Sequence, residues 1–149
     1  MAEEEFWQLI SLINKSALEN QDGKSAVAPV EQALAGKSVA EIQSFHALLS
    51  RALYDIDGEI YADNAGESGE SDDAFLYARC YVIAQGKEHY NSVKADPNQM
   101  PTKSIDQWCE SLLYVAPNAW GKITDSNPDE WDYFPDISFE TGSNTNLWT

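Results

Sequence analysis

Asp72 and Asp73 are the residues whose types and spacing could most readily do chemistry. The two aspartates follow a Gly- and Ser-rich acidic stretch and precede an almost wholly apolar run over residues 74–84. Two carboxylates act as a catalytic pair only where both face one substrate. Adjacent helix positions point about 100° apart, so the pair instead predicts a helix start with Ser71 as its N-cap. The alternative is an enzyme of unrecognised type that uses both aspartates and Arg79 in a cleft between helices.

The other side chains that could act as nucleophiles, bases or metal ligands are few and isolated. Neither His46 nor His89 has a Cys, Asp or Glu at a spacing typical of a metal site. The sequence has no Gly-rich phosphate loop and no nucleophile elbow. Cys80 and Cys109 lie in apolar helical surroundings, which predicts free buried thiols and a reducing compartment rather than a disulfide. We therefore expect no metal site and no cofactor, and we favour a protein without catalytic residues.

A strongly acidic stretch precedes the aspartate pair. Residues 55–73 contain eight acidic side chains and no basic one. An EF-hand calcium loop beginning at Asp55 would need glycine at its sixth position, where this sequence has Ile60. The calcium motif therefore fails, and the stretch predicts a negatively charged surface that attracts a basic partner. The partner-binding residues expected in it are Asp57, Glu59, Asp63, Glu67 and Glu70.

Arg79 is a charged residue in the most apolar stretch of the chain. A charge in such surroundings needs a partner. Asp72 and Asp73 lie seven and six residues earlier, so Arg79 would have to reach back along the helix to meet them. A carboxylate from another helix is an equal candidate. We expect structural polar roles for Ser71, Asp72, Asp73 and Arg79.

Apolar residues at helical spacing recur along most of the chain, and strand patterns are weak. Ser38 and Glu41 match a capping box, and Ser104 with Gln107 forms a second match. The expected helices span residues 3–19, 29–36, 38–61, 71–86, 87–96 and 104–123. We predict a mainly α, compact single-domain bundle of about five to six helices over residues 1–123, with the apolar fourth helix at its centre.

The last part of the chain, residues 124–149, has a different composition. It holds six acidic residues, no basic one and five large aromatic residues, without a helical period. Two interpretations are open: an irregular tail packed on the helical domain, or a loose segment that folds against a partner. Trp131, Asp132 and Tyr133 are the partner-binding residues expected in this tail.

The stretch SDDAFLYARCYVIAQGKEHYNSVKADP, residues 71–97, resembles the core of a bacterial family of unknown function, domain family 4240. The similarity covers roughly residues 3 to 123 and includes the opening FWQLI and the LLYVAPNAW segment. Ala74 replaces the family's usual Gly, Tyr81 replaces its usual Trp, and Pro117 is not part of its pattern. The resemblance implies a compact, mainly helical bacterial domain and supplies no activity. The positions that carry it are Ser71, Asp72, Asp73, Phe75, Arg79, Val82, Ile83, Gly86, Lys87, Asp96 and Pro97.

The net charge of −16 limits the classes of partner. Such a surface repels nucleic-acid phosphates and anionic membranes and attracts basic proteins. An acidic N-terminus and the lack of an apolar run long enough to cross a bilayer predict a cytoplasmic protein. The favoured hypothesis is a non-catalytic acidic binding protein, in its sharp form an immunity protein that inhibits a basic bacterial toxin such as a nuclease. The alternatives are the enzyme described above and a regulatory domain that binds a small ligand or a partner helix.

Overall fold

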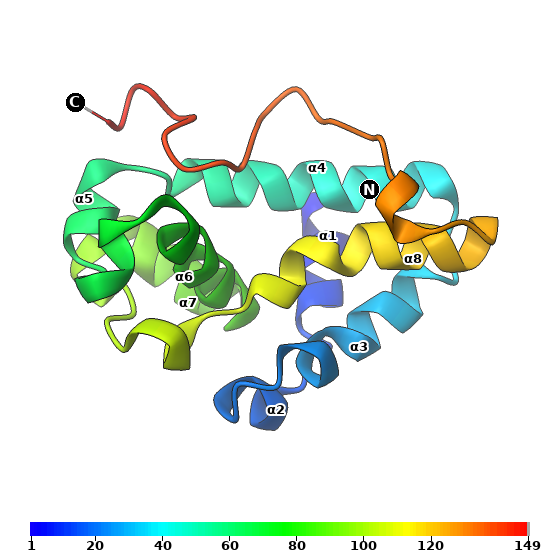
Figure 1. Cartoon of the computed structure of the whole chain (residues 1–149), viewed down its shortest axis with the longest axis horizontal. Coiled ribbons are helices and arrows are strands. Elements are labelled where there is room, and N and C mark those ends of the chain that lie inside the picture. Colours follow the sequence, from blue (N-terminus) through cyan, green and yellow to red (C-terminus); the bar gives the residue numbers. More distant parts are fainter. Residues whose placement is uncertain (149) are drawn as a thin grey trace.

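Helix α4, Val39–Asp55, begins at the capping box expected from the sequence. Ser38 Oγ accepts a hydrogen bond from the Glu41 amide at 3.2 Å, and Glu41 Oε1 accepts one from the Ser38 amide at 3.4 Å. In the computed structural model, which describes residues 1–148, α4 is the long helix against which α1, α6 and α8 pack (Figure 1). The α-helices are α1 (Glu3–Ile10), α2 (Lys15–Glu19), α3 (Gly23–Leu34), α4 (Val39–Asp55), α5 (Glu59–Asp63), α6 (Asp72–Ala84), α7 (Lys87–Ala95) and α8 (Val115–Thr124).

The mainly α fold class is confirmed. Short 3₁₀ segments connect the helices, and the described residues contain no strand. None of the helices within residues 1–148 combines the length and the apolar content that crossing a membrane requires. The 3₁₀ segments are η1 (Gly66–Glu70), η2 (Pro97–Gln99), η3 (Ser104–Gln107), η4 (Glu110–Tyr114) and η5 (Pro128–Glu130).

Helix α6 is buried on most sides, as its composition predicts. Ser71 Oγ accepts a hydrogen bond from the Ala74 amide at 3.2 Å, which confirms Ser71 as the N-cap. Most of the side chains that follow are buried, including Phe75, Arg79 and Cys80. Gly86 has a φ of 108°, a conformation that glycine adopts readily, and this allows the chain to turn directly into α7.

Two of the expected helices near the N-terminus differ from the prediction, one by an interruption and one by an earlier start. The helix expected over residues 3–19 divides into α1 and α2, because the Asn14 amide donates to the carbonyl of Ala26 rather than within a helix. The Asn14 side chain then caps α2 by accepting from the Ala17 amide. Helix α3 begins earlier than expected, behind an Asp22 cap, so Pro29 lies inside the helix rather than in its first turn.

Two later helices also differ from the prediction. The helix expected to reach residue 61 ends at Asp55, and α5 follows after a short turn. The second capping-box match is wrong, since Ser104 has a φ of 54° and begins a 3₁₀ segment without a side-chain cap. The Cys109 amide donates to the carbonyl of Tyr77 on α6, and this contact holds the chain outside an α-helix until α8 begins at Val115.

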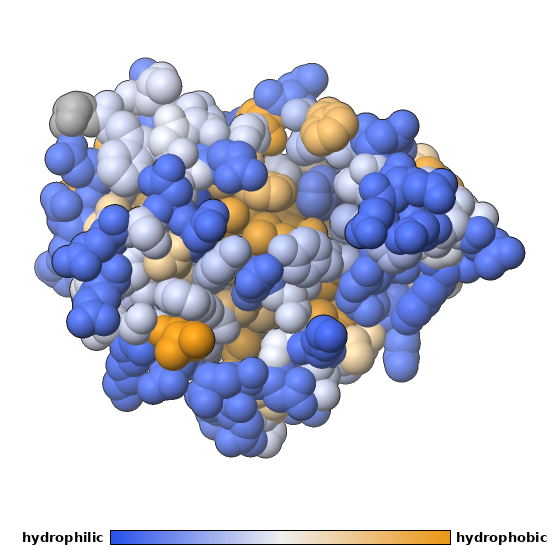
Figure 2. Space-filling model, viewed as in Figure 1, coloured by the Kyte–Doolittle hydropathy of each residue, from blue (hydrophilic) through white to orange (hydrophobic). Residues whose placement is uncertain are grey.

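The C-terminal tail packs on the helical domain. In Figure 1 it runs from the end of α8 along α4 and then toward α5. Side chains of residues 131–139 alternate between half-buried and exposed, as in an extended segment lying on a surface. Of the two interpretations, the packed tail holds for residues 125–148, while residue 149 lies outside the described residues. Figure 2 shows that the same face is largely hydrophilic, with an apolar hollow across its middle.

Candidate functional site

A cleft with a volume of about 640 Å³ lies between the tail and the helices beneath it. We call it the tail cleft. Residues 131–140 form one wall, and α4, α6, η4 and the first turn of α8 form the other. Most of its lining is aromatic or aliphatic, which is typical of a binding site. The side chains that line it include His46, Asp73, Trp131, Tyr133, Phe134, Phe139 and Glu140.

His46 on α4 is a buried polar residue of the tail cleft, with only 6% of its surface exposed. Its ring meets those of Trp131, Tyr133 and Phe139 edge-on, at centroid distances of 5.6, 6.4 and 6.0 Å. Burial lowers the pKa of His46 to about 4, so the imidazole is neutral at pH 7. Its Nδ1 has no hydrogen-bond partner among the described residues. The wall of the cleft therefore contains a neutral imidazole whose Nδ1 atom is both buried and unpaired.

Acidic and exposed aromatic residues lie at the edge of the tail cleft. Asp73 on α6 and Glu140 on the tail line it and are both exposed. Asp132 and Asp136 lie on the outward side of the same tail segment. Phe134 also lines the cleft and is 85% exposed, although exposed phenylalanine is costly in water. The edge thus combines negative charge with an aromatic ring available for contact.

Asp57 holds the far end of the tail in place. Its side chain is fully buried and accepts hydrogen bonds from the amides of Gly142 and Asn144 at 3.0–3.1 Å. It also accepts one from Trp148 Nε1 at 2.8 Å. The expectation that Asp57 belongs to an exposed acidic surface is wrong, because the tail covers it and occupies both carboxylate oxygens. Its role in this structure is to anchor the tail.

Arg79 is the second anchor. Its guanidinium donates to the carbonyls of Leu53 and Phe139 at 3.0 and 3.1 Å, and to Thr141 Oγ1 at 2.9 Å. It also lies 4.7 Å from the centre of the Phe75 ring. Burial lowers the pKa of Arg79, and the nearby Asp57 carboxylate opposes that shift. The positive charge of Arg79 is thus compensated by Asp57, which lies outside α6.

Asp72 and Asp73, both exposed in the first turn of α6, do not form ion pairs with Arg79 among the described residues. Asp72 helps to hold the tail through its backbone, because its carbonyl accepts a hydrogen bond from Thr141 Oγ1 at 2.7 Å. Asp73 contributes its side chain to the tail cleft. The adjacent aspartates therefore have different surroundings.

Apart from the buried Asp57, the predicted partner-binding residues fall into two groups. Trp131 and Tyr133 line the tail cleft against the middle of α4, and the exposed Asp132 lies between them. The remaining acids lie on α5 and η1, beyond the C-terminal end of α4, and the structure does not bring them to the cleft. We call these four residues, which are exposed or half-buried, the acidic patch: Glu59, Asp63, Glu67 and Glu70.

Both cysteine thiols are sequestered. Cys80 and Cys109 are free buried thiols, as predicted. Burial raises the pKa of Cys80 well above its usual value and that of Cys109 to about 11, so neither thiol ionises near neutral pH. Within residues 1–148, no three His, Cys, Asp or Glu side chains are placed to hold a metal ion.

Comparison with known proteins identifies the helical part of the chain. A family model described as a protein of unknown function, DUF4240, matches residues 1–122. The chain belongs to this family. No curated protein and no solved structure matches it. In this DUF4240 member the match includes His46 and Asp73 but ends before the tail, so the tail cleft is built half from the family domain and half from residues outside it.

Sequence reasoning missed His46 and Phe139 as site residues. His46 is a single histidine on an apolar helix, and nothing in its neighbourhood along the chain points to the tail. A signal for Phe139 does exist, because residues 131–139 alternate between inward residues such as Trp131, Tyr133 and Ile137 and outward residues that are polar except for Phe134. That period of two predicts a segment with one face on the protein.

Proposed function

We propose that this DUF4240 protein is a non-catalytic binding protein whose tail cleft receives a basic segment of a protein partner. The observation that carries the proposal is that aromatic side chains and exposed carboxylates lie together at the tail cleft of a strongly acidic protein. Aromatic walls enclose the cleft, exposed carboxylates of Asp73 and Glu140 lie at its edge, and the whole chain has a net charge of −16.

A lysine or arginine side chain fits the chemistry of this cleft. Aromatic ring faces attract cations, and the carboxylates at the edge can pair with the charged group. Aromatic residues are also frequent hot spots of protein interfaces, and Phe134 is already exposed there.

The sharper form of the proposal is an immunity protein that neutralises a basic toxin in the bacterial cytoplasm. A nuclease toxin must attract phosphate groups and therefore presents a basic surface. The tail cleft would anchor that surface, while the acidic patch on α5 and η1 would speed association through long-range attraction. Two buried free thiols are consistent with a reducing compartment.

Binding to the product of the neighbouring gene tests the proposal, because immunity proteins are encoded beside their toxins. Co-purification of the two proteins should be strong at low salt and weaken as salt rises. Expression of the neighbour alone should stop growth, and co-expression of this protein should restore it. Unchanged growth with the neighbour alone would contradict the immunity form of the proposal.

Phe134→Ala is the most direct test of the cleft, since the side chain is 85% exposed and its loss should leave stability unchanged. It should weaken binding about tenfold or more, as the loss of an interface hot spot does. Ile105→Ala is the matched control, because Ile105 is 64% exposed on η3 and does not line the cleft. Equal effects of the two changes would place the interface elsewhere.

The charge at the edge is tested by a double change. Asp73→Asn with Glu140→Gln removes two negative charges from the cleft, and Glu4→Gln with Asp106→Asn removes two exposed ones elsewhere. Both proteins have the same net charge, so general attraction is equal. At high salt, only the cleft variant should bind the partner more weakly than the wild-type protein does. Equal affinities would show that these carboxylates do not contact the partner.

A further inference from the structure

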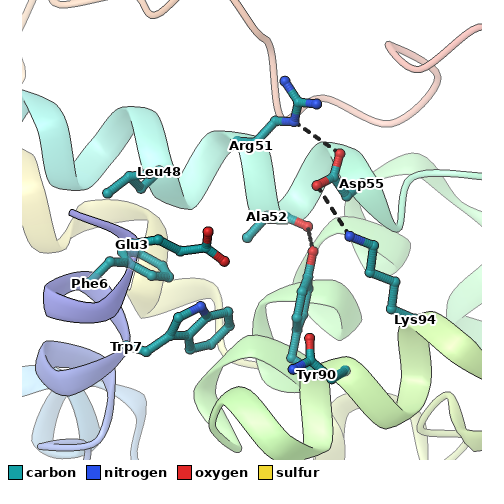
Figure 3. A pocket seen from close by; sticks show the side chains of 10 residues that line it. Glu3, Phe6, Trp7, Leu48, Arg51, Ala52, Asp55, Tyr90 and Lys94 are labelled. Carbon is teal, nitrogen blue, oxygen red and sulfur yellow. Dashed lines mark hydrogen bonds and ion pairs between the residues drawn. The ribbon is translucent and has the colours of Figure 1, made fainter. Parts of the chain in front are cut away.

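A second cleft, separate from the tail cleft, lies between α1, α4 and α7 (Figure 3). Its volume is about 370 Å³, large enough for a small organic molecule. All its lining residues fall between positions 3 and 94, within the part that matches the DUF4240 model, and the tail contributes none. We call it the α1–α7 cleft.

One wall of the α1–α7 cleft is aromatic and firmly held. The rings of Trp7 and Tyr90 lie 5.2 Å apart at an angle of 44°, and both residues are more than nine-tenths buried. The Tyr90 hydroxyl donates to the carbonyl of Ala52 at 2.7 Å, which fixes the ring and leaves its face as the wall (Figure 3). Phe6 packs behind Trp7 with a centroid distance of 5.0 Å. This wall suits an apolar group of a ligand.

The opposite side of the cleft carries a net positive charge. Asp55 Oδ1 accepts from Arg51 Nε at 3.1 Å, and Asp55 Oδ2 lies 3.6 Å from Lys94 Nζ. Two cations thus share one carboxylate. Within the described residues, the terminal amino groups of Arg51 form no hydrogen bond. These groups are the type that binds a carboxylate in pairs.

Glu3 supplies a negative charge from α1. Its carboxylate faces the space beside the Trp7 and Tyr90 rings (Figure 3). It forms no ion pair within the described part of the chain. The four charged side chains of the cleft, Glu3, Arg51, Asp55 and Lys94, therefore sum to zero, with one positive charge in excess near α4 and α7 and one negative charge near α1.

We infer that the α1–α7 cleft binds a small zwitterion, an α-amino acid with an apolar side chain. The ligand's ammonium group pairs with Glu3, its carboxylate with Arg51 and Lys94, and its side chain packs on Trp7 and Tyr90. An anion would be repelled by Glu3 and by the net charge of the chain, and a simple cation would leave the excess positive charge of Arg51 and Lys94 without a partner. A ligand with both charges avoids both penalties. This inference is independent of the proposed partner-binding function.

Titration of the full chain with phenylalanine and leucine, followed by NMR, tests the inference. Either amino acid should shift the NMR signal of the Trp7 indole N–H. The variant Trp7→Phe lacks this signal and so identifies it in the spectrum. N-acetylphenylalanine lacks the ammonium and phenylalanine amide lacks the carboxylate. Each should bind about tenfold more weakly than phenylalanine, as expected when one charge-assisted hydrogen bond is lost. The inference is overturned if neither amino acid shifts Trp7 at concentrations on the order of tens of millimolar, or if the blocked forms bind equally well.

Two variants assign the charges. Glu3→Gln should weaken phenylalanine about tenfold while N-acetylphenylalanine, which has no ammonium, binds no worse than before. Lys94→Gln should weaken phenylalanine and leave phenylalanine amide unaffected. Glu4→Gln is the matched control, since Glu4 is exposed, adjacent in sequence and absent from the cleft lining. Because Glu3 and Lys94 are exposed, the variants should fold, which circular dichroism confirms. Equal losses for Glu3→Gln and Glu4→Gln would overturn the assignment of Glu3.

Discussion

The carboxylate of Asp57 lies 2.8 Å from the indole nitrogen of Trp148, although the two residues are 91 positions apart in the chain. Asp57 also accepts two backbone amides of the tail, and Arg79 binds the tail at Phe139 and Thr141. One buried anion and one buried cation therefore set the path of the tail. Because the tail forms a wall of the tail cleft, these two residues also determine the shape of that cleft.

Asp57→Asn should release the end of the tail. The amide group replaces one acceptor oxygen by a donor that faces the N–H groups of Gly142, Asn144 and Trp148. We expect the free energy of unfolding to fall by about 3 kcal/mol, since buried hydrogen bonds to a charged group are lost. Urea denaturation measures the change. Asp63→Asn, at an exposed position on α5, is the control and should stay close to wild type.

Arg79→Met should have a similar cost and the same structural consequence. The methionine fills much of the space but leaves the carbonyls of Leu53 and Phe139 without their donor. The expected loss is about 3 kcal/mol. The double variant with Asp57→Asn should lose less than the sum of the two single changes, because both release the same segment. Urea denaturation of the wild type, the two single variants and the double variant measures this difference. Strict additivity of the two losses would show that the anchors act independently.

Local sequence signals predict much of the helical framework. The Ser38–Glu41 capping box, the Ser71 cap and the apolar character of α6 are each set by residues close together in the chain, and each is present in the structure. These features depend on backbone donors and side chains within a few positions, which is the range over which sequence patterns are informative.

Distant contacts determine the features that local patterns do not predict. Asp57 belongs to an acidic run, and only the tail, more than 80 positions later, makes it a buried anchor. The break after α1 follows from a hydrogen bond between Asn14 and Ala26 of a neighbouring segment. The tail cleft joins residues of α4 to residues 131–140, so no continuous stretch of sequence contains it. The alternation in the tail indicates an inner face but does not show which helices it covers.

His46 should make stability depend on pH. Its pKa is lowered from 6.5 to about 4 by burial, so the unfolded chain binds a proton more readily than the folded one below pH 6.5. The contribution of His46 to stability is therefore fully present above pH 6.5 and is lost as the pH falls toward 4. Between pH 8 and pH 5 the contribution of His46 should fall by about 2 kcal/mol. Comparing the free energy of unfolding of the wild type with that of His46→Gln at both pH values isolates the contribution of His46. Identical pH dependence in the two proteins would contradict the prediction.

Cys80 and Cys109 should be unreactive in the folded protein. Both are buried, and the raised pKa values keep the thiols protonated at pH 8. A disulfide reagent such as dithiodipyridine should label neither at pH 8 in native buffer and both after addition of guanidinium. Rapid labelling of one thiol in native buffer would show that the helices around α6 open more easily than this packing implies.

Gly69 should be essential for placing the acidic patch. A Cβ atom at this position would lie 2.7 Å from the carbonyl carbon of Ala62, so η1 could not stay against α5. We expect Gly69→Ala to lower the free energy of unfolding by about 3 kcal/mol, because backbone must move to accommodate the methyl group. Gly36→Ala is the matched control, since a Cβ there would meet its nearest neighbour, the carbonyl oxygen of Ala33, at 3.4 Å. Thermal melts of both variants measure the difference, and equal stabilities would show that η1 shifts without cost.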